Sequence, residues 1–107
     1  MNTSGILKDA RGRNWLRFIN AQIRYGAFVA RFETLEMPTE ARQILSDHER
    51  YISQQVLTHL DEFDRKMNNY ELSIVWDGER EPVSVCDVQV MDSELSFRLK
   101  GSDVTNK

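Results

Sequence analysis

The sequence predicts an α+β fold: one long amphipathic helix packed on an antiparallel sheet, with strands before the helix and a three-stranded meander after it. Apolar residues recur at helical spacing over residues 39–67, and the spacing then changes to two. Gly and Pro are too scarce to mark a linker, so residues 1–107 are expected to form a single domain. Its small and polar ends, about residues 1–4 and 101–107, are expected to be frayed.

The first third of the chain is interpreted as strands, although part of it also fits a helix. Residues 9–12, Asp-Ala-Arg-Gly, have the composition of a type I turn with apolar residues on both sides, which suits a hairpin. Residues 28–35 alternate loosely, with Phe28, Ala30 and Phe32 on one side. Helical spacing is also present in this third, in Leu16, Ile19, Ile23, Ala27 and Ala30. Aromatic and β-branched residues favour strands.

The middle of the chain predicts one continuous helix over residues 39–67. Pro38 suits a first helical turn and Thr39 is a competent N-cap, while Asn68 and Asn69 supply a stop. No Gly or Pro interrupts the pattern. At 1.5 Å per residue the helix would be on the order of 45 Å long, so one end is expected to project or to meet a partner.

The last third predicts a meander of strands at residues 70–76, 83–91 and 94–100. Asp77-Gly78 and Asp92-Ser93 supply the turns. The middle strand pairs with both neighbours, which leaves the other two as possible edges. The expected core draws on all these elements and contains Leu16, Phe18, Phe32, Leu45, Ile52, Val56, Leu60, Phe63, Ile74, Trp76, Val85, Phe97 and Leu99.

Charge is distributed unevenly along the chain. The net charge is −3, but residues 1–35 hold six cations and two anions, so the remainder is strongly acidic. We expect these opposite charges to meet within the fold, and a binding surface is the other interpretation. A single cysteine, no signal-peptide pattern and no long apolar run predict a cytoplasmic protein without a membrane span.

Candidate chemical groups are few. His48 and His59 would lie about 16 Å apart along a continuous helix, which excludes a shared metal ion. Cys86 is interpreted as a buried structural thiol, and Asp87 is expected to face outward from its strand. Solvated charge is expected at the carboxylates Asp61, Glu62 and Asp64, and Glu79 and Glu81 form a second pair of carboxylates at a turn. Gly-rich phosphate loops and nucleophile elbows are absent, so we expect no enzyme, no cofactor and no metal.

Small acidic domains of this kind most often act by binding. The sequence therefore favours a non-enzymatic protein-binding module, such as an inhibitor, an immunity-type protein or an adaptor. It also favours a homodimer formed through the long helix or an edge strand. The alternative is a nucleic-acid-binding protein that uses the Arg- and aromatic-rich segment from Arg11 to Arg31, and an enzyme assembled at a dimer interface is the weakest hypothesis. The candidate interaction surface consists of Arg13, Arg17, Arg24, Arg31 and Tyr25.

Overall fold

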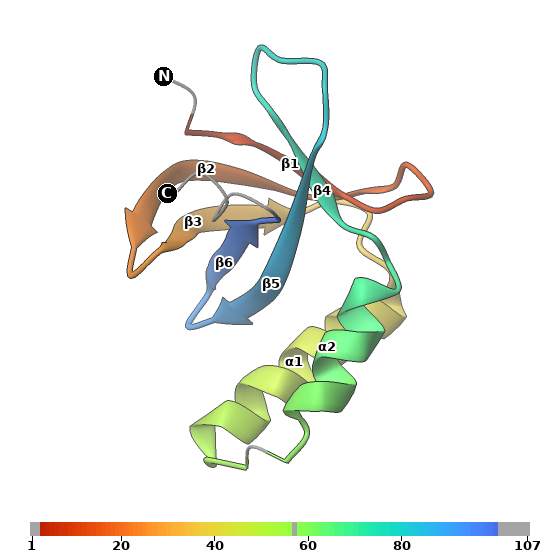
Figure 1. Ribbon diagram of the computed structural model, residues 1–107, viewed down its shortest axis with the longest axis vertical. Coiled ribbons are helices and arrows are strands. Elements are labelled where there is room, and N and C mark those ends of the chain that lie inside the picture. The colour runs from red at the N-terminus through yellow and green to blue at the C-terminus, as the bar shows by residue number, and fades with distance from the viewer. Residues whose placement is uncertain (1–2, 57, 101–107) are drawn as a thin grey trace.

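The computed structural model describes residues 3–56 and 58–100, which form a closed six-stranded antiparallel β-barrel with a helical hairpin beside it (Figure 1). The order around the barrel is β1-β2-β3-β6-β5-β4, and β4 pairs with β1 to close it. The elements are β1 (Gly5–Lys8), β2 (Asn14–Arg24), β3 (Ala27–Thr34), α1 (Thr39–Ser53), α2 (Leu60–Asn68), β4 (Ser73–Trp76), β5 (Val83–Met91) and β6 (Glu94–Leu99).

Aromatic rings fill the barrel. Phe18 contacts Phe97 at a centroid distance of 5.4 Å and Trp76 at 5.5 Å, in both cases edge to face. Phe28 stacks on Phe97 at 5.4 Å and meets Trp76 edge-on. The cross-strand pairs Phe18–Phe32 and Phe28–Phe97 place these rings on the same inner face. The alternation of inward and outward residues that predicted strands in the first third is therefore confirmed.

Two antiparallel helices replace the single predicted helix, and that prediction is wrong. α1 ends after Ser53 with Gln55 in the left-handed region at φ 60°. The backbone N–H of Val56 donates to Tyr51 O at 2.8 Å and that of Gln55 donates to Ile52 O at 3.0 Å, which is the Schellman pattern of a helix end. Glycine usually occupies the position of Gln55, so this helix end carries no ordinary stop signal.

The reversal folds α2 back against α1, and both helices pack on β5 (Figure 1). α1 buries Ala41, Leu45 and His48, and α2 buries Phe63 and Met67. Among the described residues, the longer helix has 15 residues, so no helix of 45 Å projects from this part of the chain, and the radius of gyration is 13.4 Å. The expected burial is correspondingly wrong at the turn, where Val56 is exposed and Ile52 and Leu60 are only half-buried.

The meander is confirmed, with β5 between β4 and β6, but its open edges are not. β4 pairs with β1 and β6 pairs with β3, so neither residues 70–76 nor residues 94–100 form a free edge. Regular pairing also begins only at Ser73. Closure and the broken helix together remove both structural grounds on which a homodimer was expected.

Residues 3 and 4, which belong to the N-terminal end predicted to be frayed, make backbone hydrogen bonds to the barrel. Thr3 O accepts a hydrogen bond from Ala21 N at 2.7 Å, and Ser4 O accepts one from Asp77 N at 2.9 Å, so residues 3 and 4 are fixed to the barrel. Residues 1–2 and 101–107 lie outside the described residues. Within the described ranges, neither helix has the length and apolarity needed to cross a membrane.

The helical hairpin predicts a large loss of stability for one substitution and a small change for another. Phe63 is 7% exposed and its ring stacks on His48 at 3.7 Å, so Phe63→Ala should lower the free energy of unfolding by about 3–5 kcal/mol. Val56 is 38% exposed at the reversal, so Val56→Asp should change it by less than about 1 kcal/mol. Urea unfolding of both variants measures this. A loss of several kcal/mol from Val56→Asp would contradict the hairpin and favour the continuous helix.

Candidate functional site

The tip of the β2–β3 hairpin exposes a tyrosine in a conformation that tyrosine rarely adopts. Arg24 pairs with Ala27, so Tyr25 and Gly26 form a two-residue turn. Their φ angles of 53° and 81° fit a type I′ turn, which favours Asn, Asp or Gly. A side chain in the left-handed region costs roughly 1 kcal/mol. Tyr25 is 98% exposed, so packing within the described fold does not offset this cost.

Apolar and cationic side chains accompany Tyr25. Ile23 is 68% exposed, and Ile19 is exposed opposite Arg31 in the β2–β3 register. Arg24 Nη2 lies 3.3 Å from Glu94 Oε2, but both side chains are about half exposed, and such surface pairs contribute little stability. We refer to Ile19, Ile23, Arg24, Tyr25 and Arg31 as the hairpin-tip surface.

The remaining two residues of the predicted surface lie at the other end of β2 and have internal partners. Arg17 donates from both terminal nitrogens to Asp77, at 3.1 and 2.7 Å, across the intervening strand β1. This fork lowers the pKa of Asp77. Arg13 Nε lies 2.8 Å from Asp9 Oδ2. The structure thus divides the predicted surface, and it places Arg13 and Arg17 in ion pairs within the protein.

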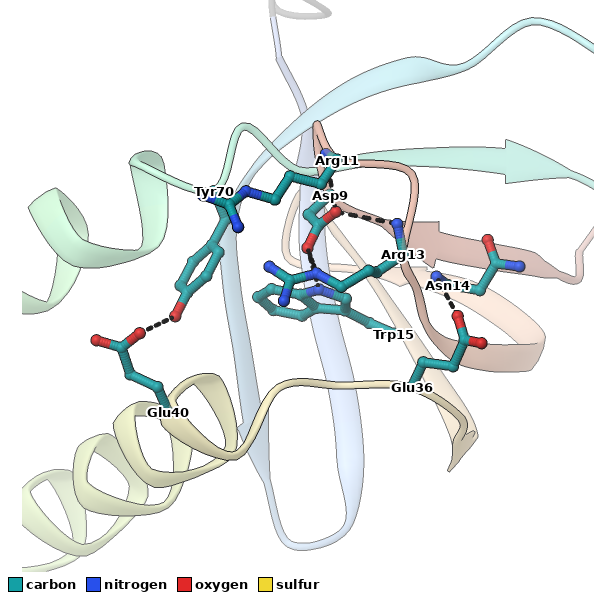
Figure 2. Close-up of polar contacts among 8 residues, drawn as sticks. All are labelled: Asp9, Arg11, Arg13, Asn14, Trp15, Glu36, Glu40 and Tyr70. Carbon is teal, nitrogen blue, oxygen red and sulfur yellow. Dashed lines mark hydrogen bonds and ion pairs between the residues drawn. The ribbon is translucent and has the colours of Figure 1, made fainter.

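Asp9 is a buried carboxylate that organises the β1–β2 turn (Figure 2). Its Oδ1 accepts from the backbone N–H groups of Arg11 and Arg13, at 3.0 and 3.1 Å. Its Oδ2 accepts from Arg13 Nε and Trp15 Nε1, both at 2.8 Å. Burial by itself would raise the pKa of Asp9, but these hydrogen bonds outweigh it and lower the pKa below its ordinary value. Asp9 therefore stays ionised near neutral pH.

Two neighbours extend this network toward the helices. The ring of Trp15 is fully buried and meets that of Tyr70 edge-on at 4.8 Å. Tyr70 donates from its hydroxyl to Glu40 Oε1 at 3.1 Å, and burial is the main reason that its pKa is raised. The composition of residues 9–12 predicted the turn, and Gly12 N donates to Asp9 O as a type I turn requires, but burial of the Asp9 carboxylate was not predicted. An Asp at the first turn position followed by Arg and Trp was the available signal.

The two histidines meet, contrary to the expected separation of about 16 Å. His48 Nδ1 lies 2.9 Å from His59 Nε2, because the helix reversal brings the rings together. The outer nitrogens face oxygen acceptors: His48 Nε2 lies 3.0 Å from Gln89 Oε1, and His59 Nδ1 lies 2.8 Å from Val56 O. This row of side-chain contacts links both helices and β5. Within the described ranges, however, no group of three or more His, Cys, Asp or Glu side chains is arranged so that it could hold a metal ion.

Three other candidates behave largely as expected. Asp87 faces outward at a bulge in β5 and lies 3.5 Å from Arg98 Nε. Cys86 precedes it and is only half-buried, so the burial predicted for it is not complete. Asp61, Glu62 and Asp64 are exposed, as the interpretation of solvated charge predicted, and so are Glu79 and Glu81.

Comparison of the chain with models of known protein families, with curated proteins and with solved structures found no match. Functional inference therefore depends on the geometry described above.

Asp9→Asn should destabilise the protein by about 2–4 kcal/mol, because an amide leaves at least one buried donor without an acceptor. Denaturant unfolding at pH 7 measures the loss. Asp61→Asn is the matched control, since Asp61 is exposed on α2. The difference between Asp9→Asn and the wild type should shrink as the pH falls below about 4, where the wild-type protein loses the stability given by ionised Asp9. An Asp9→Asn variant as stable as its control would contradict the role of Asp9.

His48 predicts a second pH dependence with the same sign. Burial lowers the pKa of His48, although its hydrogen bond with Gln89 opposes this. The stability contributed by neutral His48 is therefore complete above the unfolded-state pKa of about 6.5 and is lost as the pH falls below it. Wild-type stability should fall between pH 7.5 and pH 5.5, by at most about 1.4 kcal/mol per pH unit from this group. In His48→Gln the slope should be shallower, and an unchanged slope would assign it to other groups.

Proposed function

We propose that the protein is a small non-enzymatic binding module that docks another protein through the hairpin-tip surface. The observation that carries this proposal is Tyr25, fully exposed at a turn position that disfavours it. Uncommon backbone conformations concentrate at functional sites, and exposed tyrosines are frequent anchors of protein interfaces. Packing of the Tyr25 side chain within the described fold does not offset the cost of its backbone conformation, and contact with a partner would.

The composition of the hairpin-tip surface describes the partner. Tyr25 and Ile23 offer adjacent apolar area that suits a recess on the partner. Arg24 is next to Tyr25 in the chain, and Arg31 lies opposite Ile19 further along the hairpin; both are exposed and favour an acidic rim on the partner. Inhibitors, immunity-type proteins and adaptors all act by such docking. The strands that carry this surface are anchored nearer the barrel, where β2 pairs with β1 over residues 14–18 and β3 pairs with β6 over residues 28–30.

Nucleic-acid binding is less well supported by the arrangement. Arg13 and Arg17 each have a carboxylate partner within the protein, which reduces the charge available for phosphates. The net charge of −3 acts in the same direction. The remaining cations of the hairpin-tip surface number too few to form an extended basic path.

Site-specific photocrosslinking tests the proposal. Replacing Tyr25 with benzoylphenylalanine in the native host should crosslink one protein partner, whereas the same replacement at Arg80, exposed in the β4–β5 loop, should not. With that partner purified, Tyr25→Ala should weaken binding by about 30-fold, the loss typical of an interface anchor. Calorimetry measures the affinity.

Two variants separate docking from misfolding. Arg80→Ala is the matched control and should leave both affinity and thermal stability unchanged. Tyr25→Asn should lose affinity while it keeps or gains stability, because Asn suits the turn position better. Crosslinks to nucleic acid in place of protein, or full affinity in Tyr25→Ala, would contradict the proposal.

A further inference from the structure

A second feature, independent of the hairpin tip, is an open cavity between the β1–β2 turn and the helical hairpin. It encloses about 410 Å³, a volume within the range of small-molecule sites. The β1–β2 turn contributes Arg11 and Arg13 to its lining, α1 contributes Glu40, and Lys66 and Tyr70 come from α2 and the segment after it. Figure 2 shows both arginine side chains reaching from the turn toward the ring of Tyr70.

Arg13 is held in a fixed orientation by the carboxylate beneath it. Asp9 binds Nε and the backbone N–H of Arg13, so the side chain is fixed at both ends of its stem. Among the described residues, neither terminal nitrogen of Arg13 makes a hydrogen bond. All four hydrogen bonds that Asp9 accepts come from the protein, so its charge is already offset. The two terminal nitrogens of this guanidinium form an edge that can donate to two oxygens of a carboxylate or phosphate at once.

Arg11 adds a second cation to the same cavity. Its guanidinium makes no ion pair within the described part of the chain. Lys66 is partly neutralised by Glu62 at 3.4 Å, and Glu40 accepts a hydrogen bond from Tyr70. The lining contains three cations and two anions, and Glu62 balances Lys66 from beside the cavity. Among the described residues, the terminal nitrogens of Arg11 and Arg13 make no hydrogen bond, so these two guanidinium groups are the ones available to an anion.

We propose that this cavity binds a small organic anion, whose phosphate or carboxylate group contacts the guanidinium groups of Arg11 and Arg13. Tyr70 borders the same space and offers a ring against which the organic part of the ligand packs. Glu40 limits the charge that the cavity accepts, which favours a ligand with one anionic group over a polyanion.

Titration with phosphate, phenyl phosphate and benzoate, followed by backbone and indole N–H chemical shifts at low ionic strength, tests the proposal. We expect saturable shifts at Trp15 Nε1–H, which lies beneath the site, and tighter binding of the two aromatic anions than of phosphate. Sodium chloride at matched ionic strength is the control for screening. Shifts equal to those in chloride, or shifts without saturation, would overturn the proposal.

Charge variants of opposite sign sharpen the test. Arg11→Gln should weaken phenyl phosphate binding by about three- to tenfold, and Glu40→Gln should strengthen it by a similar factor, as expected for one charge near the ligand. Arg80→Gln changes the net charge equally but lies outside the cavity, so its affinity should match the wild type. Equal effects of Arg11→Gln and Arg80→Gln would assign binding to net charge and overturn the site. Arg13 is left intact, because its loss would also unpair Asp9.

Discussion

Closure of the barrel at β1 is the constraint on which the remaining structure depends, and it requires glycine at position 5. Gly5 pairs with Phe18 on one side and with Trp76 on the other. A Cβ at this position would overlap the carbonyl oxygen of Val75 and lie 3.0 Å from the Phe18 ring. Because Gly5 has no Cβ, β1 fits between β2 and β4, and the rings of Phe18 and Trp76 meet inside the barrel. The closed barrel then holds β5 between two partners, and β5 supports both helices.

Local patterns predicted most of the elements, and distant contacts decided what they missed. The strands, the turns at residues 9–12 and 92–93 and the central position of β5 all follow from spacing and turn composition. Closure does not, because it joins β1 to β4 and β3 to β6, which lie far apart in the sequence. The helix reversal was hidden because Gln55 occupies a left-handed position that usually signals itself with glycine. Stacking of Phe63 on His48 accompanies that reversal.

The candidate sites show the same division. Composition singled out the arginines and Tyr25, but only the register showed that Arg24 and Arg31 lie along the β2–β3 hairpin, while Arg13 and Arg17 lie near the start of β2 beside Asp9 and Asp77. Burial of Asp9 depends on Trp15 being enclosed beneath Tyr70, and these two residues are in contact although they lie far apart in the sequence. The predicted separation of the histidines, which excluded a shared metal ion, assumed an unbroken helix, so their contact was not foreseen. The sequence therefore shows which chemical groups are present, whereas the topology of the fold decides which groups each side chain contacts.

The seam between β4 and β5 has kinetic consequences. Only the pairs Ser73–Ser84 and Ile74–Val83 join these strands, whereas β2 and β3 share a much longer ladder. Barrels rich in non-local pairs fold slowly, because chain entropy is lost before the closing contacts form. The two local hairpins, β2–β3 and β5–β6, can form early, and the short seam is completed late. In the native state the same seam is the natural place for transient opening, and amide hydrogen exchange there should outpace exchange in the β2–β3 ladder.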